Sequence, residues 1–276
     1  MTVYFDVDRL VKGVEVYPCG ITVVKRKAVP SDHTPTGGER KEIVELTAKA
    51  RQKMLFTMAT SSIKMRSMMT LTYPERYPTD GSEVKYHFKR MMAELKSYYA
   101  MEMFWFLEFQ QRGAPHLHIL TDRENPSHDD RAFVARNWVR IIGMDSNSGY
   151  MGMGHGATEE HRSRCIAVHV HKRGWEPMKS EDGAVRYMAK YACKTYQKIV
   201  PENYRNVGRF WGCTKSVRDN KEIPMEIAIT NNVLRNVLAD EGHKSFDWDV
   251  IPTYLYGSKA LYFAARSLAE QNEVPF

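Results

Sequence analysis

The fold is decided by Met103-Phe-Trp-Phe-Leu-Glu-Phe109, Gln110-Gln-Arg-Gly-Ala-Pro115 and His116-Leu-His-Ile-Leu-Thr121, which follow one another directly. The first segment is aromatic and typical of a β-strand. The second contains the Gly and Pro residues of a turn, and the third is typical of a return strand. The sequence therefore predicts a β-hairpin whose turn is centred on Arg112.

Three polar side chains of this hairpin are predicted to lie on one face. Residues two apart in a strand point to the same side, so His116 and His118 share a face. A turn centred on Arg112 places Glu108 directly across from His116, and cross-strand neighbours lie within about 5 Å. A carboxylate buried among aromatic residues is costly without a cation. Two imidazoles and one carboxylate would leave coordination positions open, as in a catalytic metal site.

The remaining chain predicts helices and strands around the hairpin. The pattern of apolar and turn-forming residues indicates helices over residues 39–61, 82–99, 132–142 and 182–199, and strands over 66–73 and 165–171, with a last strand beginning at 210–211. This order of elements indicates an α+β fold, with an antiparallel central sheet and flanking helices.

A second group of candidate residues lies in Arg186-Tyr-Met-Ala-Lys-Tyr-Ala-Cys-Lys194. At about 100° per helical residue, four side chains fall within a stripe of about 100°. They are Tyr187, Lys190, Tyr191 and Lys194. A phenol with a reference pKa of about 10 needs a base or positive charge nearby to attack as phenolate. The competing interpretation is that both tyrosines pack against the domain and both lysines are solvated.

Composition limits the classes of protein to consider. The chain has 276 residues, of which 43% are hydrophobic and 26% charged, as in globular proteins. Its net charge of +7 is compatible with a polyanionic partner. No apolar run approaches about 18 residues, so no transmembrane helix is expected. The four cysteines form no C-x-x-C pair and are expected to be reduced thiols of a cytosolic protein. A P-loop sequence is absent, which excludes a P-loop motor within the chain.

Another histidine pair competes for the metal. The sequence Val168-His-Val-His171 alternates like a strand and would place His169 and His171 on one face. This pair lacks a partner acid, and the neighbouring Lys172 and Arg173 would repel a cation. A solvated or DNA-facing strand is the simpler interpretation.

These motifs together resemble the HUH endonucleases. Arg112-Gly-Ala-Pro-His-Leu-His-Ile119 resembles their His-hydrophobic-His motif, and Tyr187-Met-Ala-Lys-Tyr-Ala-Cys-Lys194 is similar to their double-tyrosine motif. Met69-Thr-Leu-Thr-Tyr73 resembles their first motif, and Gly208-Arg-Phe-Trp-Gly212 a segment that often follows the tyrosine helix. The order of the motifs is similar to that of rolling-circle replication initiators, such as the A protein of icosahedral single-stranded-DNA phages and many phage and plasmid Rep proteins.

The resemblance implies a site-specific single-stranded DNA endonuclease and strand transferase. A tyrosine would attack the scissile phosphodiester of origin DNA, leaving a free 3′-hydroxyl and a 5′-phosphotyrosine link. Host polymerase would extend the 3′-hydroxyl, and a host helicase would unwind the template. The residues implied are the ligands of Mg²⁺ or Mn²⁺ (Glu108, His116 and His118), the nucleophiles (Tyr187 and Tyr191) and the phosphate-stabilising cations (Lys190 and Lys194).

The resemblance also predicts how the chain is organised. It covers residues 61–215 as a catalytic domain, between a basic N-terminal extension of residues 1–60 and a C-terminal extension of residues 216–276 with no assigned role. The expected location is the cytoplasm of a bacterial or phage-infected host, without membrane association. The alternatives are a transposase or relaxase that uses the same centre, and a basic DNA-binding protein without catalytic activity.

Overall fold

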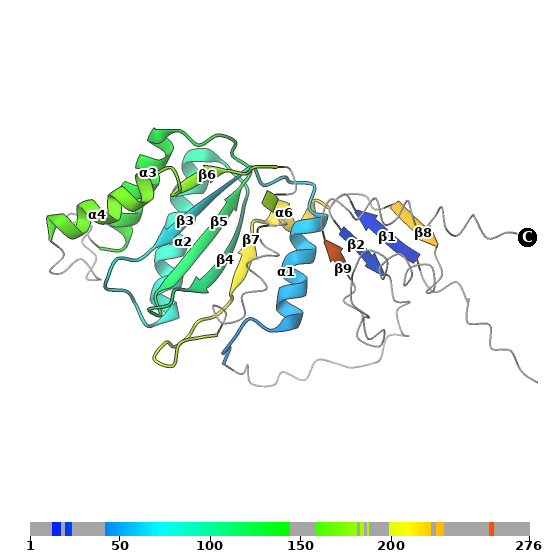
Figure 1. Ribbon diagram of the computed structural model, residues 1–276, viewed down its shortest axis with the longest axis horizontal. Coiled ribbons are helices and arrows are strands. Elements are labelled where there is room, and N and C mark those ends of the chain that lie inside the picture. Colours follow the sequence, from blue (N-terminus) through cyan, green and yellow to red (C-terminus); the bar gives the residue numbers. More distant parts are fainter. Residues whose placement is uncertain are drawn as a thin grey trace, which may run out of the picture.

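A five-stranded antiparallel sheet forms the centre of the protein, with strand order β6-β3-β5-β4-β7 (Figure 1). The computed structural model describes residues 13–17, 20–23, 42–143, 158–180, 183–184, 187, 199–221, 225–228 and 254–256. The strands of this sheet are β3 (Ser67–Thr72), β4 (Met103–Phe109), β5 (Pro115–Thr121), β6 (Trp175–Pro177) and β7 (Trp211–Cys213). The predicted hairpin is confirmed as the adjacent pair β4 and β5.

Two helices cover one face of this sheet. They are α2 (Gly81–Tyr99) and α3 (His128–Ile141), and α3 begins with a capping box between Ser127 and Asp130. The Phe88 ring of α2 packs edge-on against Trp105 of β4, with ring centroids 4.9 Å apart. Because side chains alternate along a strand, Trp105 faces away from Glu108. The predicted α+β fold is therefore confirmed, and the predicted metal ligands lie on the face opposite α2.

One predicted strand is wrong. The segment predicted as a strand over residues 165–171 belongs mostly to helix α4 (Glu159–Val170). The hydroxyl of Thr158 caps this helix by accepting from the backbone N–H of His161. The buried residues of α4 are Cys165 and His169, which stand four apart, as a helix requires and a strand does not. The edge strand next to β3 is instead β6, which the sequence did not predict.

The N-terminal and C-terminal flanks of the chain share a second sheet. Its strand order is β8-β1-β2-β9, and all its strand pairs are antiparallel. The strands are β1 (Gly13–Tyr17), β2 (Gly20–Val23), β8 (Met225–Ala228) and β9 (Tyr254–Tyr256). The predicted boundaries at residues 60 and 216 stay predictions, but the two flanks come together in space.

Helix α1 (Ala48–Thr60) lies between the two sheets (Figure 1). It begins after Thr47, later than the predicted start at residue 39. Its residues Met54 and Met58 are buried in the same core as the central sheet. A short helix, α6 (Lys215–Asp219), follows β7. Within the described ranges, no helix has the length and apolar character needed to cross a membrane.

The N-terminus of α2 makes a close backbone contact that predicts a sensitive glycine. The backbone N–H of Gly81 donates to the carbonyl of Arg205 at 2.7 Å, and a Cβ at position 81 would lie 2.2 Å from the carbonyl oxygen of Asn206. We expect Gly81→Ala to lower the free energy of unfolding by about 1–3 kcal/mol, because backbone atoms must move. Urea unfolding followed by tryptophan fluorescence measures this. The exposed neighbour Ser82 provides the control, and equal midpoints for Gly81→Ala and Ser82→Ala would contradict the prediction.

Candidate active site

The hairpin brings an acid and two histidines together in the predicted register. Glu108 of β4 pairs directly with His116 of β5, and His116 pairs on its other side with Thr72 of β3. His118 lies two residues further along β5, so it shares the face of His116, and their ring centroids are 4.6 Å apart. The predicted cross-strand position of Glu108 is therefore confirmed.

A buried hydrogen bond joins Glu108 to His118. The Oε2 atom of Glu108 lies 3.0 Å from Nε2 of His118, and the two residues are only 3% and 4% exposed. The ring of Phe106 stacks on the His118 imidazole at a centroid distance of 4.7 Å. Because an ionised carboxylate only accepts hydrogen bonds, Nε2 of His118 donates to it, and Nδ1 of the neutral ring is then an acceptor.

Tyr187 approaches this pair from the predicted tyrosine segment. Its hydroxyl oxygen lies 3.3 Å from Nδ1 of His118, and the two rings meet edge-on with centroids 5.9 Å apart. With Nδ1 as the acceptor, the phenol donates to His118, which in turn donates to Glu108. A hydroxyl, an imidazole and a carboxylate in this order form the arrangement that activates an oxygen nucleophile.

The other predicted residues of the tyrosine segment lie outside the described residues. They are Lys190, Tyr191 and Lys194. Their predicted roles stay predictions, as does the helix expected over residues 182–199.

His116 has a different set of partners from His118. Its Nδ1 lies 3.2 Å from Nε2 of Gln110, the first residue after β4. Burial lowers the pKa of His116 to about 3, with a smaller contribution from the neighbouring His118. The ring is therefore neutral near pH 7, and a neutral imidazole is the form that binds metals.

The donor set suits a divalent ion by type, but it is not assembled around one. Imidazole nitrogens and a carboxylate are common ligands of catalytic metals. Among the residues that the structure describes, however, no three His, Cys, Asp or Glu side chains are arranged to hold an ion. The Glu108 carboxylate and Nε2 of His118 are instead bonded to each other. Binding of an ion by both groups requires replacement of that hydrogen bond.

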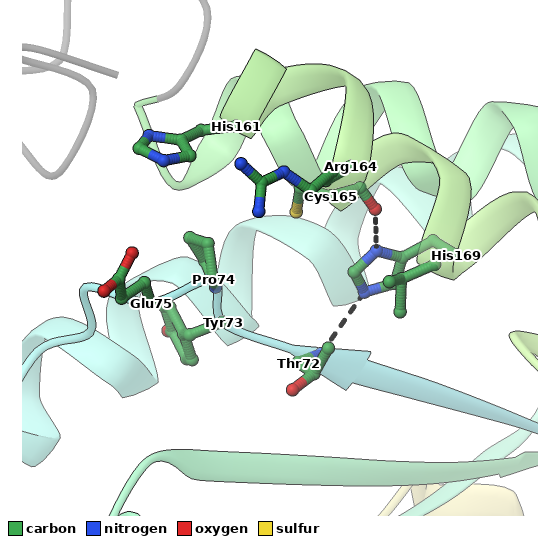
Figure 2. A pocket seen from close by; sticks show the side chains of 9 residues that line it. Thr72, Tyr73, Pro74, Glu75, His161, Arg164, Cys165 and His169 are labelled. Carbon is green, nitrogen blue, oxygen red and sulfur yellow. Dashed lines mark hydrogen bonds between the residues drawn. The ribbon is translucent and has the colours of Figure 1, made fainter. Parts of the chain in front are cut away.

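The competing pair His169 and His171 is excluded as a metal site by the contacts of His169. Figure 2 shows the His169 ring held between α4 and the end of β3. Its Nδ1 lies 2.8 Å from the carbonyl oxygen of Cys165, and its Nε2 accepts from the backbone N–H of Thr72 at 3.2 Å. Both ring nitrogens are therefore used within the protein, while His171 is exposed. The pair also does not share a strand, because His169 belongs to α4.

A pocket of about 150 Å³ lies beside His169, between α4 and the end of β3. His161 and Arg164 of α4 and Glu75 of the loop after β3 line it, together with the buried side chain of Cys165 (Figure 2). Burial raises the pKa of the Cys165 thiol to about 11, so the thiol stays protonated and unreactive. Cys165 and Cys213 are free thiols, as predicted; Cys19 and Cys193 lie outside the described residues.

Sequence reasoning missed three residues around the site. Thr72, Gln110 and Arg112 form hydrogen bonds that lead to His116. Arg112 was used only as the centre of the turn. No sequence pattern indicated these contacts, because they depend on how the turn packs against the end of β3.

The comparison with protein families gives one match. Residues 66–196 match the model of a family described as "Replication-associated protein" and designated ORF2. The match indicates a replication-associated protein. It includes β3, the β4–β5 hairpin and Tyr187, so it covers the residues that form the site. Comparisons with curated proteins and with solved structures give no match.

The contacts of His169 predict a pH-dependent contribution to stability. Burial lowers the pKa of His169 below its ordinary value of 6.5. An unfolded chain therefore binds a proton at this residue at a higher pH than the folded protein does. The stabilising contribution is complete above about pH 6.5 and decreases as the pH falls below that value.

We expect His169→Gln to reduce this decrease between pH 7 and pH 5, because glutamine does not titrate. The substitution also removes the bond to Cys165 and lowers stability at pH 7 by about 1–3 kcal/mol. Denaturant unfolding at several pH values measures both effects. The exposed His171 provides the matched control His171→Gln. The same pH dependence in the wild type and in His169→Gln would contradict the assignment.

Proposed function

We propose that this protein initiates rolling-circle replication by cutting one strand of DNA at an origin, with Tyr187 as the nucleophile. The observation that carries the proposal is the hydrogen-bond chain from Tyr187 through His118 to the buried Glu108. The match to a replication-associated family supports origin DNA as the substrate. The net charge of +7 is compatible with binding to a phosphate backbone.

The proposed reaction is a transesterification at phosphorus. The Tyr187 oxygen forms a bond to the scissile phosphorus while the bond from phosphorus to the 3′-oxygen breaks. The products are a free 3′-hydroxyl and a 5′-phosphotyrosine. Because one phosphate ester replaces another, the 3′-hydroxyl can later reverse the reaction and rejoin the strand without ATP.

His118 is placed to manage the proton of the phenol. In the tautomer with hydrogen on Nε2, its Nδ1 accepts the Tyr187 proton as the oxygen attacks, and Glu108 stabilises the resulting imidazolium. In the tautomer with hydrogen on Nδ1, the ring instead donates to the Tyr187 oxygen and stabilises the phenolate. Both forms lower the cost of generating the nucleophile.

We further propose that Glu108, His116 and His118 bind Mg²⁺ or Mn²⁺. The bound ion would polarise the scissile phosphodiester and orient it. Mg²⁺ is usually bound through oxygen, so two imidazole nitrogens favour Mn²⁺. The neutral state of His116 near pH 7 supports its role as a ligand. Replacement of the direct bond between Glu108 and His118 is the rearrangement that this proposal requires.

The remaining assignments concern the second tyrosine and the host proteins. We propose that Tyr191 cuts the regenerated origin while Tyr187 holds DNA, with Lys190 and Lys194 near the phosphate. Host polymerase extends the 3′-hydroxyl, and a host helicase separates the strands. A transposase or relaxase would use similar chemistry, but the replication-associated match favours an initiator.

The covalent link to Tyr187 is the direct test. We expect incubation with Mn²⁺ and labelled single-stranded oligonucleotides, tiled across the replicon that carries this gene, to give an SDS-resistant adduct. Peptide mapping should place the adduct on Tyr187 or Tyr191. Tyr187→Phe should reduce strand transfer on the order of 100-fold or more, because only the nucleophilic oxygen is removed. The exposed Tyr98 provides the control Tyr98→Phe. An adduct that survives in the double Tyr187→Phe, Tyr191→Phe variant would overturn the proposal.

Metal dependence is tested separately from DNA binding. We expect His116→Ala or His118→Ala to abolish cleavage while single-stranded DNA affinity changes little, because phosphate contacts elsewhere supply most of the affinity. Excess EDTA should have the same effect on the wild type, and added Mn²⁺ should restore cleavage. Adduct formation in the presence of EDTA, at the rate seen with Mn²⁺, would contradict the metal assignment.

A further inference from the structure

The turn of the hairpin is tied to the end of β3 by Arg112. Although Arg112 is exposed, its guanidinium donates to three backbone carbonyls. Nη2 lies 2.7 Å from the carbonyl oxygen of Tyr73, and Nη1 lies 2.7 Å from that of Pro74 and 3.2 Å from that of Glu75. The guanidinium also lies over the ring of Tyr77, whose hydroxyl donates to the Arg112 carbonyl. These contacts fix the position of the guanidinium.

The remaining donor of Arg112 determines how the Gln110 amide is oriented. The Nε atom of Arg112 lies 3.0 Å from Oε1 of Gln110. A guanidinium only donates hydrogen bonds, so the oxygen of the amide must face Arg112. The NH₂ group of Gln110 then faces the other way, where it lies 3.2 Å from Oγ1 of Thr72 and 3.2 Å from Nδ1 of His116.

This orientation assigns the tautomer of His116. An amide NH₂ group only donates hydrogen bonds, so Nδ1 of His116 must accept one. In a neutral imidazole the proton is then on Nε2. Because Nδ1 is bonded to Gln110, Nε2 is the nitrogen left for a metal ion, and a metal ligand must be unprotonated.

We propose that Gln110 is a positioning residue for His116 and that it sets the metal affinity of the site by selecting the tautomer of this ring. Arg112 acts through Gln110 by fixing which end of its amide faces the imidazole. Binding of an ion through Nε2 requires the proton on Nδ1, where only the amide oxygen of Gln110 could accept it. The hydrogen bond between Arg112 and Gln110 therefore opposes metal binding by His116. The effect on metal rests on the proposed function, whereas the tautomer does not.

The test measures the tautomer in the full-length, metal-free protein. Long-range ¹H–¹⁵N correlation spectra of protein labelled with ¹⁵N-histidine distinguish a protonated from an unprotonated ring nitrogen. Comparison with His116→Ala assigns the His116 signals. We expect the wild type to carry its His116 proton on Nε2. Wild-type protein with the proton on Nδ1 would overturn the proposal.

The variant Gln110→Glu reverses the polarity of the contact. A carboxylate beside Arg112 accepts hydrogen bonds from both Arg112 and His116, so the His116 proton should move to Nδ1. The affinity for Mn²⁺, measured by electron paramagnetic resonance of the free ion, should rise at least about tenfold. The matched control is Gln111→Glu, which adds the same charge at the exposed neighbouring position. This control should leave the tautomer unchanged and raise the affinity less than about twofold.

A third variant, Gln110→Met, separates hydrogen bonding from packing. It keeps the length of the side chain and removes the donor to Nδ1, so the His116 signals should show both tautomers. A wild-type tautomer in both Gln110→Met and Gln110→Glu would overturn the proposal, as would equal Mn²⁺ affinities of Gln110→Glu and Gln111→Glu. None of these measurements uses DNA. If no adduct forms on Tyr187, the proposed function fails, and the role of Gln110 in selecting the tautomer is judged independently.

Discussion

The register between β4 and β5 is the constraint on which the site depends. Glu108 lies opposite His116 because the two strands pair around a turn centred on Arg112. A shift of one residue in one strand would turn its side chains to the opposite face. Glu108 would then point toward the layer that contains α2, away from both histidines. The contacts of Arg112 with the backbone after β3 hold the turn in place and so preserve this register.

The two faces of the central sheet therefore have separate roles. One face packs against α2 and α3 and buries aromatic side chains such as Trp105 and Trp138. The other face carries Glu108 and the two histidines, and Tyr187 approaches it from a segment distant in sequence. Burial of Glu108 and His118 lowers the local polarity, which strengthens their hydrogen bond and makes an unpaired charge costly. The hydrophobic layer thus supplies the rigidity and the low polarity that the polar face needs.

The parts of the structure that the sequence predicted depend on local spacing. A short turn between two apolar runs determines the pairing of Glu108 with His116, so the hairpin could be found without knowledge of the rest of the chain. The strand predicted over residues 165–171 is wrong, because alternation over a few residues does not distinguish a strand from a helix with two buried positions. The helical spacing of Cys165 and His169 was the better signal. The second sheet could not be predicted, because its strands come from opposite ends of the chain.

The same hydrogen-bond logic applies to both histidines of the site. His118 accepts at Nδ1 from Tyr187 and donates from Nε2 to Glu108, and His116 accepts at Nδ1 from Gln110. Both rings therefore carry their proton on Nε2, and the polar groups of the site satisfy one another. This explains why the donor set has the composition of a metal site without its arrangement. A ligand that takes up the Nε2 positions must shift a proton in each ring to Nδ1. In His118 that shift turns an acceptor of the Tyr187 proton into a donor to the Tyr187 oxygen, so occupation of the site and activation of the nucleophile are coupled through one imidazole.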